Sequence, residues 1–378
     1  MKVLIAPQEL KGTLTGTQAA EAISRGIFTT LEGAEIDVLP IADGGPGTVD
    51  MFARATGARV VEADAEDALG RSLGSFFAVK GERAVIEMAA ASGLGRLFPA
   101  ELEPLRATTR GTGQLIAEAL KLGCKELWVG LGGSATTDGG VGALETLGAR
   151  FFDAEGNWLK PGGAPLAQLE RLKLERVEAR FKEVTLTALA DVRAPLLGPE
   201  GAAAVFAPQK GATPDEVKEL EGALERLHQV VLKQLGRDLA RAPGAGAAGG
   251  LGYGLMLLGA TVKDGFGTLA ELCGLPERIR RADVVVTAEG RLDAQTAMGK
   301  APAGLAAMAR AMGKPVVILA GSIEPGAPLD LFSMAEVIDP AGGQKAKLPS
   351  SADAAALLVE ASSRIAPRFP SLVPPKQD

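Results

Sequence analysis

The chain has 378 residues, a formal charge of −6 and 47% hydrophobic residues, enough for two domains that each bury a core. Acids and bases are mixed along it, and no basic stripe interleaved with aromatic residues is present, which argues against nucleic acid as a partner. No apolar run approaches the roughly 18 residues of a membrane span, and "MKVLIAPQEL" carries charge too early for a signal peptide, so we expect a cytoplasmic protein with no membrane partner.

Histidine and cysteine are too scarce for several kinds of catalytic site. The single histidine, His228, lies at helical spacing among leucines and valines, which is typical of an ordinary helix residue. Cys124 and Cys273 stand in no metal-binding spacing and are predicted to be small buried side chains. A Ser-His-Asp or Cys-His site is therefore not expected, and any general base would be Asp, Glu or Lys.

Both ends of the chain alternate strand and helix patterns. At the start, the expected order is strand, helix, strand, helix, over residues 2–7, 13–27, 34–43 and 47–57. Near the end, strands are predicted over 282–290, 314–321 and 335–340, with a helix over 301–313 and a loose tail over 369–378. This alternation predicts a parallel sheet with helices on its faces.

The middle of the chain has a mixed pattern. It predicts a hairpin over 75–89, helices over 112–123 and 215–240, and strands over 125–131 and 184–192. We therefore predict an α/β fold of two domains. A Rossmann-like domain would be formed by residues 1–65 plus 280–378, and a second, mixed α/β domain would be inserted as residues 66–279. The active site would lie in the cleft between them.

Four segments contain one or two acidic residues in a glycine-rich loop or at the end of a predicted strand. They are "ADGGPGT" with Asp43, "GGSATTDGG" with Asp138, "LTALADV" with Asp191, and "TAEGRLDAQT" with Glu289 and Asp293. Backbone N–H groups of such loops bind anions, and nearby carboxylates suit a hard cation such as Mg²⁺. Each loop alone reads as a tight turn in which glycine supplies a positive φ. Together they favour a shared site for phosphate and metal.

A dinucleotide fingerprint is the competing interpretation. "GLGGSA" at 130–135 matches it after a strand, but the expected helix is interrupted by Asp138-Gly139-Gly140. "GAGAAG" at 244–249 follows no strand, and the common P-loop motif is absent from the sequence. Phosphoryl transfer fits better, because it needs charge positioning more than proton transfer by histidine.

Four basic residues stand beside these loops. Lys11 follows the first strand, and Arg291 stands between Glu289 and Asp293, so each is placed to meet an anion or to remain a solvated surface charge. Lys210 and Lys300, which also lie next to glycines, carry the same two readings.

Several blocks resemble the bacterial glycerate kinase family that has two α/β domains. They include "APQELKGTLT", "PIADGGPGT", "GLGGSATTDGGVGALETLGARF", "LADVRAPLLGPEGAAAVFAPQKGA" and "VVVTAEGRLDAQTAMGKAP", and the resemblance runs from residue 2 to about 325. It implies phosphoryl transfer from ATP to D-glycerate with Mg²⁺. The usual product in this family is 2-phosphoglycerate, and 3-phosphoglycerate has also been assigned to members.

The resemblance carries over to individual residues, and loop position and charge suggest the role of each. We expect Asp191 to accept the hydroxyl proton or to bind metal, and Lys11 and Arg291 to neutralise the substrate carboxylate or the transferring phosphoryl group. Asp43 and Asp293 would bind substrate, and Asp293 would also bind metal. The nucleotide and its phosphates would be bound by Gly132, Gly133, Ser134, Asp138, Glu289, Gln295 and Thr296.

The chain departs from the family pattern at three places. It has Gln8-Glu9-Leu10 where the family usually has Asp-Ser-Phe, Ala194 where the family usually has Asn, and Ala288 where it commonly has Gly. Alternatives therefore stay open: a kinase of another small hydroxy acid, a non-catalytic binding protein derived from a kinase, or an NAD-dependent hydroxy-acid dehydrogenase. A homodimer is one option for its assembly.

Overall fold

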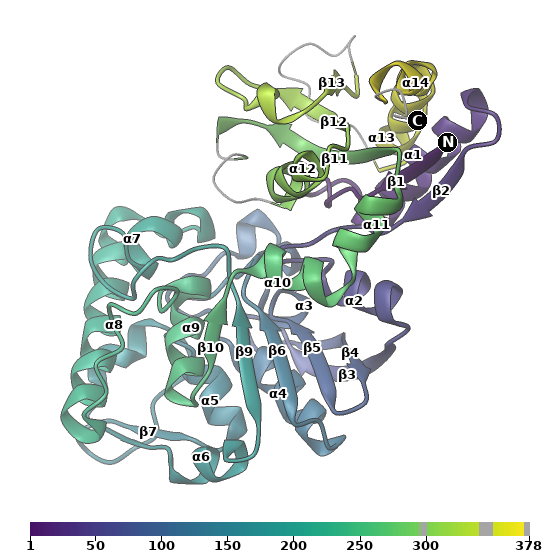
Figure 1. The fold of residues 1–378 in the computed structure, drawn as a ribbon. Helices are drawn as coiled ribbons and strands as arrows, with labels where there is room; N and C mark the ends of the chain where they lie inside the picture. Colours follow the sequence, from purple (N-terminus) through teal and green to yellow (C-terminus); the bar gives the residue numbers. More distant parts are fainter. Residues whose placement is uncertain (295, 297–300, 340–350, 374–378) are drawn as a thin grey trace. The chain divides into compact units, whose positions relative to one another are not determined.

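The computed structural model describes residues 1–294, 296, 301–339 and 351–373, and it divides the chain into two compact units (Figure 1). The first unit comprises Met1–Asp43, Asp50–Thr56 and Phe266–Asp378, and the second comprises Gly44–Val49 and Gly57–Gly265. The predicted fold class is confirmed: both chain ends build one α/β unit, and the middle builds another. The predicted domain borders differ from these units, because residues 44–49 and 57–65 belong to the second unit and residues 266–279 to the first.

A five-stranded parallel sheet forms the centre of the first unit. Its strand order is β13–β12–β11–β1–β2. The strands are β1 (Lys2–Ile5), β2 (Glu35–Val38), β11 (Val284–Leu292), β12 (Val316–Ile323) and β13 (Met334–Val337). The inner strands are runs of Val, Ile and Leu because both faces of a parallel sheet are covered.

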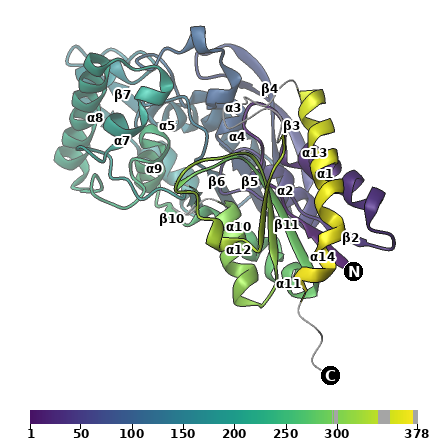
Figure 2. The ribbon, with the colours of Figure 1, turned by 90° about the horizontal axis from the view of Figure 1, so that it is seen from above.

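Helices pack on both faces of this sheet. One face bears α1 (Gly16–Thr30) and α13 (Ser351–Ile365), which lie side by side (Figure 2), and the other bears α11 (Leu275–Arg281) and α12 (Ala301–Ala311). A Cβ on Gly26 of α1 would lie 2.3 Å from the carbonyl oxygen of Val359 in α13, so the crossing requires glycine. Further helices are α2 (Thr48–Thr56), α10 (Gly265–Leu272) and α14 (Phe369–Leu372).

The C-terminal segment differs from its prediction as a loose tail. Phe369 begins α14, is fully buried and belongs to the same core as α1 and α13. The buried ring of Phe369 thus holds α14 against the core of the first unit. Residues 374–378 lie outside the described part.

A six-stranded mixed sheet forms the centre of the second unit. Its order is β10–β9–β6–β5–β4–β3; β5, β6, β9 and β10 run parallel, while β3 and β4 are antiparallel additions. The strands are β3 (Arg59–Glu66), β4 (Ser72–Lys80), β5 (Arg83–Glu87), β6 (Glu126–Gly130), β9 (Thr185–Leu189) and β10 (Thr261–Lys263). The predicted hairpin is confirmed as β4 and β5. A separate two-stranded sheet pairs β7 (Arg150–Phe152) with β8 (Arg171–Lys173).

The helices of the second unit enclose a large aliphatic core with this sheet. They are α3 (Ala89–Ser92), α4 (Arg110–Lys121), α5 (Val141–Leu147), α6 (Glu175–Phe181), α7 (Ala202–Phe206), α8 (Pro214–Leu235) and α9 (Ala247–Leu257). The long helix α8 begins at a capping box of Thr213 and Glu216 and ends at Gly236, whose φ is 67°. It carries His228, whose Nδ1 lies 3.3 Å from the hydroxyl of Tyr253, so the histidine makes a helix-to-helix contact as expected.

Candidate active site

The loop after β1 meets the end of β11 where the strand order of the first sheet reverses. From β1 the chain proceeds to β2 on one side, whereas β11 proceeds to β12 and β13 on the other. The backbone N–H of Gln8 donates to the carbonyl of Ala288 at 3.2 Å, and a Cβ on Gly290 would lie 3.7 Å from the backbone nitrogen of Lys11. Ligands of open α/β sheets bind outside the carboxyl ends of strands at such a switch point. The structure therefore brings Lys11 and the end of β11 to one edge.

The end of β11 separates an exposed charged pair from a buried polar one. Arg291 has a side chain that is 66% exposed, with its Nε 3.1 Å from Asp293 Oδ2. The Thr296 hydroxyl donates to Glu289 Oε2 at 3.1 Å and accepts the Asp293 amide at 3.3 Å. Thr296 and Glu289 are buried, so they shape this loop from within, while Arg291 faces solvent. Gln295, also predicted for nucleotide binding, lies outside the described residues.

Asp43, after β2, is held by a residue that departs from the family pattern. The Gln8 side-chain amide donates to Asp43 Oδ2 at 2.8 Å, and Gln8 is itself buried. Burial raises the pKa of the neighbouring Glu9, an effect that the charge of Lys11 opposes and that of Asp43 reinforces. An amide beside Asp43 donates a hydrogen bond without adding the like charge that a second carboxylate would bring.

Glycines of the second unit let three loops pack backbone against backbone at the carboxyl ends of β6 and β9. A Cβ on Gly130 would lie 2.3 Å from the Gly44 carbonyl oxygen, and one on Gly132 would lie 2.5 Å from the Gly45 Cα. Gly44, whose φ is 95°, approaches the carbonyl of Leu189 at the end of β9. The Gly132 amide donates to the Gly44 carbonyl at 3.0 Å. These glycines are therefore required by close packing as well as by turn geometry.

The turn at Gly132–Ser134 exposes two backbone donors. Gly133 is exposed and has a φ of 75°. The N–H groups of Gly133 and Ser134 donate to no group in the described part of the chain, although the Gly133 carbonyl accepts the Leu94 amide at 2.8 Å. Ser134 pairs with Gly93 in an isolated antiparallel β-bridge. The helix α5 begins seven residues after Ser134, so the helix that a dinucleotide fingerprint requires does not follow directly. The turn instead offers two N–H groups to an anion.

Asp138 is fully buried rather than placed at the loop surface. Its Oδ2 accepts the Thr109 amide at 2.8 Å, the Thr109 hydroxyl at 2.9 Å and the Gly142 amide at 3.2 Å, and its Oδ1 accepts the Gly140 amide at 3.1 Å. Burial raises the pKa of Asp138, and these hydrogen bonds oppose that rise. The carboxylate thus joins the start of α4 to the start of α5, whereas the sequence pattern predicts a nucleotide ligand there.

Asp191 follows β9 and is half-buried at the same edge as the turn at Gly132–Ser134. Its Oδ1 accepts the Gly265 amide at 2.8 Å, which orients the carboxylate. Ala194, the departure from the family's Asn, accepts the Gly246 amide through its carbonyl at 2.9 Å, a bond that any residue there can make.

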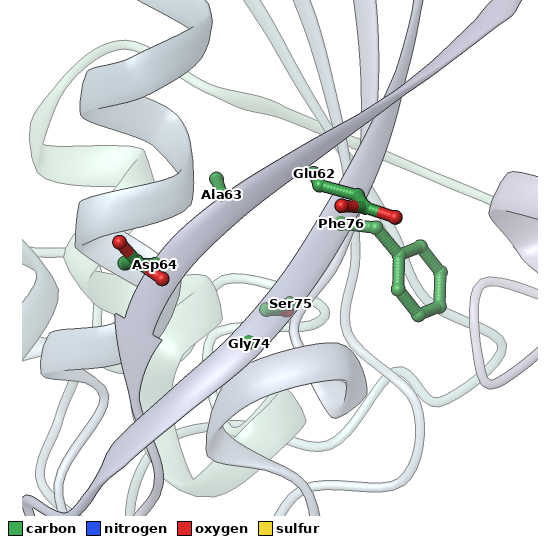
Figure 3. Close-up of a pocket in the computed structure, with 6 residues that line it drawn as sticks. All are labelled: Glu62, Ala63, Asp64, Gly74, Ser75 and Phe76. Atoms are coloured by element: carbon green, nitrogen blue, oxygen red, sulfur yellow. The ribbon is translucent and has the colours of Figure 1, made fainter.

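No preformed metal centre is present among the described residues, since none of their His, Cys, Asp and Glu side chains form a group of three that could hold an ion. Mg²⁺ needs no such group, because it retains waters and takes one or two carboxylates beside substrate phosphates. A pocket of about 420 Å³ lies elsewhere, on β3 and β4, where Glu62 stands opposite Phe76 (Figure 3). Its lining includes no predicted site residue: Glu62, Ala63, Asp64, Gly74, Ser75 and Phe76.

Lys210 is a basic residue for which the sequence left two interpretations open. It was predicted as either a surface charge or an anion ligand, yet its side chain is only 1% exposed. It lies in a short helical turn, Pro208–Lys210, that ends at Gly211 with a φ of 97°. The tight turn was visible as "PQKG", but nothing in those letters indicates that the lysine points inward.

Comparison with known proteins identifies the family. The model of the glycerate kinase family matches residues 3–369. The chain belongs to the glycerate kinase family. It is 44% identical to a glycerate kinase of Bacillus subtilis (strain 168), with 85% of each chain covered, and 41% identical to a glycerate 2-kinase of Escherichia coli (strain K12), with 85% of this chain and 86% of that protein covered.

The solved structures agree with this assignment. A putative glycerate kinase 2 from Salmonella typhimurium LT2 superposes with a TM-score of 0.80 at 35% identity, over 98% of both chains. The predicted resemblance is thus confirmed. As a member of the glycerate kinase family, the protein is a phosphotransferase that acts on a small molecule with ATP as co-substrate. No helix in the described ranges is long and apolar enough to cross a membrane.

Proposed function

We propose that this member of the glycerate kinase family transfers the terminal phosphoryl group of ATP to the 2-hydroxyl of D-glycerate, giving 2-phosphoglycerate. Family membership supports the reaction, and the relative named glycerate 2-kinase supports the position of transfer. The observation that supports the proposal is the edge at the switch point, where the chain after β1 brings the backbone of Lys11 next to the end of β11, which carries Arg291. A small hydroxy acid carries one carboxylate, which such cations would bind.

The roles of the other residues follow from their charge and position. We propose that the N–H groups of Gly133 and Ser134 hold a phosphate group of ATP, because neither donates to a group in the described part of the chain and Gly133 is exposed. Asp191 would accept the proton of the substrate hydroxyl or hold the metal, and the Gly265 amide keeps its carboxylate oriented for either task. Asp43, oriented by Gln8, would bind the substrate.

Mg²⁺ is proposed as the metal, held by Asp191 and Asp293. Carboxylate oxygens are the donors that this hard cation prefers, and the bound ion would neutralise charge on the transferring phosphoryl group. Arg291, paired with Asp293, adds a second positive charge to the same loop. The active site between the two domains and the cytoplasmic location stay predictions.

A coupled assay of ADP release over a panel of small hydroxy acids tests the substrate, and phosphorus NMR of the product tests the position of transfer. D-Glycerate should give the highest kcat/KM, and the product should carry phosphorus on the 2-oxygen. Asp191→Asn should lower kcat by a factor on the order of 10² or more. The matched control is Asp64→Asn on the exposed face of β3, which should leave kcat unchanged. Normal turnover by Asp191→Asn would remove Asp191 from the mechanism, and a 3-phosphorylated product would overturn the proposed position.

A further inference from the structure

The segment that follows the exposed turn is buried but incompletely satisfied. We call Thr136–Gly140 the inner arm; all five of its residues are buried. Within the described part of the chain, the hydroxyls of Thr136 and Thr137 have no hydrogen-bond partner. Buried polar groups without partners destabilise a fold and are rare in native proteins. The conformation of the inner arm is therefore imposed by its surroundings rather than by these side chains.

Lys210 contacts the inner arm from one side. Its Nζ donates to the carbonyl oxygen of Thr136 at 2.6 Å, and the side chain is 1% exposed. Burial lowers the pKa of Lys210 to about 7, while the nearby charge of Asp138 favours the protonated form. Burying a lysine is unfavourable for stability unless its ammonium group is paired or hydrogen-bonded, and the bond to the Thr136 carbonyl offsets part of that cost.

A strained backbone segment contacts the same carbonyl group from another chain segment. Ala248, Gly249 and Gly250 have φ values of 54°, 65° and 90°, so three consecutive residues are left-handed and one of them carries a side chain. A Cβ on Gly249 would lie 1.9 Å from the Thr136 oxygen, and the Gly249 carbonyl accepts the Gly139 amide at 3.0 Å. Such backbone persists only where the surrounding structure enforces it, and it is concentrated at functional sites.

We propose that Lys210 is a positioning residue for nucleotide binding, which acts by fixing the Thr136 carbonyl and thereby the turn at Gly132–Ser134. Ser134 lies two residues before Thr136, and the Ala135 amide between them is held by the Ser92 carbonyl at 3.1 Å. With both peptide groups fixed, the N–H groups of Gly133 and Ser134 keep one orientation toward a phosphate. Lys210 itself touches no substrate. This inference rests on the proposed phosphate role of the turn.

The experiment compares Lys210→Met and Lys210→Gln with the wild-type enzyme. Lys218→Met is the matched control, because Lys218 is an exposed lysine on α8 that pairs with Asp215. The readouts are the KM for ATP, the KM for D-glycerate, kcat, the ATP dissociation constant by titration calorimetry, and the thermal midpoint. Lys210→Met should raise the KM and dissociation constant for ATP about tenfold or more, with the KM for glycerate within about twofold. Lys210→Gln should show a smaller rise, because its amide retains N–H donors.

A purely structural role would give a different result. It would reduce the fraction of folded enzyme, and hence kcat, while the folded remainder kept its normal affinity for ATP. Unchanged ATP affinity in whichever variant folds therefore overturns the proposal. Calorimetry needs no turnover and therefore separates the two proposals. A wild-type protein that binds ATP but does not phosphorylate glycerate would refute the proposed function, and the effect of Lys210 on ATP affinity could still be measured.

Discussion

Glu145, in the second unit, allows a test of how burial changes the pKa of a carboxyl group and, through it, the stability of the protein. Its side chain on α5 is 13% exposed, and its carboxylate lies 3.6 Å from Arg110 NH1. Burial raises the pKa of Glu145 from 4.5 to about 7, an effect that Arg110 opposes and Asp138 reinforces. The protonated carboxyl group is therefore favoured in the folded chain, and the associated stability is complete below pH 4.5 and lost as the pH rises through 7.

The size of the effect follows from this shift. A rise from 4.5 to about 7 corresponds to about 3 kcal/mol of unfolding free energy, at 1.36 kcal/mol per pKa unit. Glu145→Gln removes the titration but keeps a similar shape. The stability of the variant relative to wild type should thus increase by about 3 kcal/mol between pH 4.5 and pH 8.5. For a domain of this size, that corresponds to a difference in thermal midpoint that widens by roughly 6–12 °C.

Differential scanning calorimetry of both proteins across this pH range measures the gap. Glu219→Gln is the control, because Glu219 lies on the exposed side of α8 and keeps its solvent when the chain folds. The gap for Glu145→Gln should widen with pH by more than the gap for this control. Equal behaviour of the two variants would show that burial does not favour the protonated carboxyl group of Glu145.

Two further substitutions test local contacts. Thr15→Ala removes the side-chain oxygen that accepts the Gln18 backbone N–H at 3.2 Å. The free energy of unfolding should fall by about 1 kcal/mol, seen as a lower denaturant midpoint with an unchanged slope. An unchanged midpoint would show that this exposed cap contributes nothing to stability. Asp138→Asn places an NH₂ group among the donors of Thr109, Gly140 and Gly142 and should cost roughly 3 kcal/mol or more by the same measurement; equal stability would mean that Asp138 is already protonated in the native protein.

The parts of the fold that could be predicted are those with strong local patterns. The buried runs of β1, β11 and β12 and the capping box at Thr15 are visible in the letters alone, because burial on both faces and helix starts have local signatures. The strand β3 was not predicted: it is the edge strand, with exposed charges at Arg59, Glu62 and Asp64, and its pairing with β4 decides its structure. Its omission also displaced the predicted domain border.

The candidate site was predictable to the extent that strand ends determine it. Lys11 follows β1 and Arg291 lies near the end of β11, and these two strands are neighbours at a switch point, where a rule about sheet edges predicts a ligand site. The buried positions of Glu289 and Thr296 were not predictable, because a hydrogen bond between a strand residue and the loop after it is not encoded by their spacing. The inward direction of Lys210 likewise depends on Thr136, far away in the sequence.

Asp138 shows why an acid in a glycine-rich loop can mislead. A carboxylate among glycines is the pattern expected of a ligand site, and its burial depends on Thr108 and Thr109, which lie about 30 residues earlier. Once buried, its charge must be balanced by hydrogen bonds, and five donors from two helix starts supply them. The same glycines that would expose amides to phosphate here also allow the close approach that buries the acid. The turn Gly132–Ser134 therefore stays the proposed anion site, because the N–H groups of Gly133 and Ser134 donate to no group in the described part of the chain, while the acid joins the starts of α4 and α5.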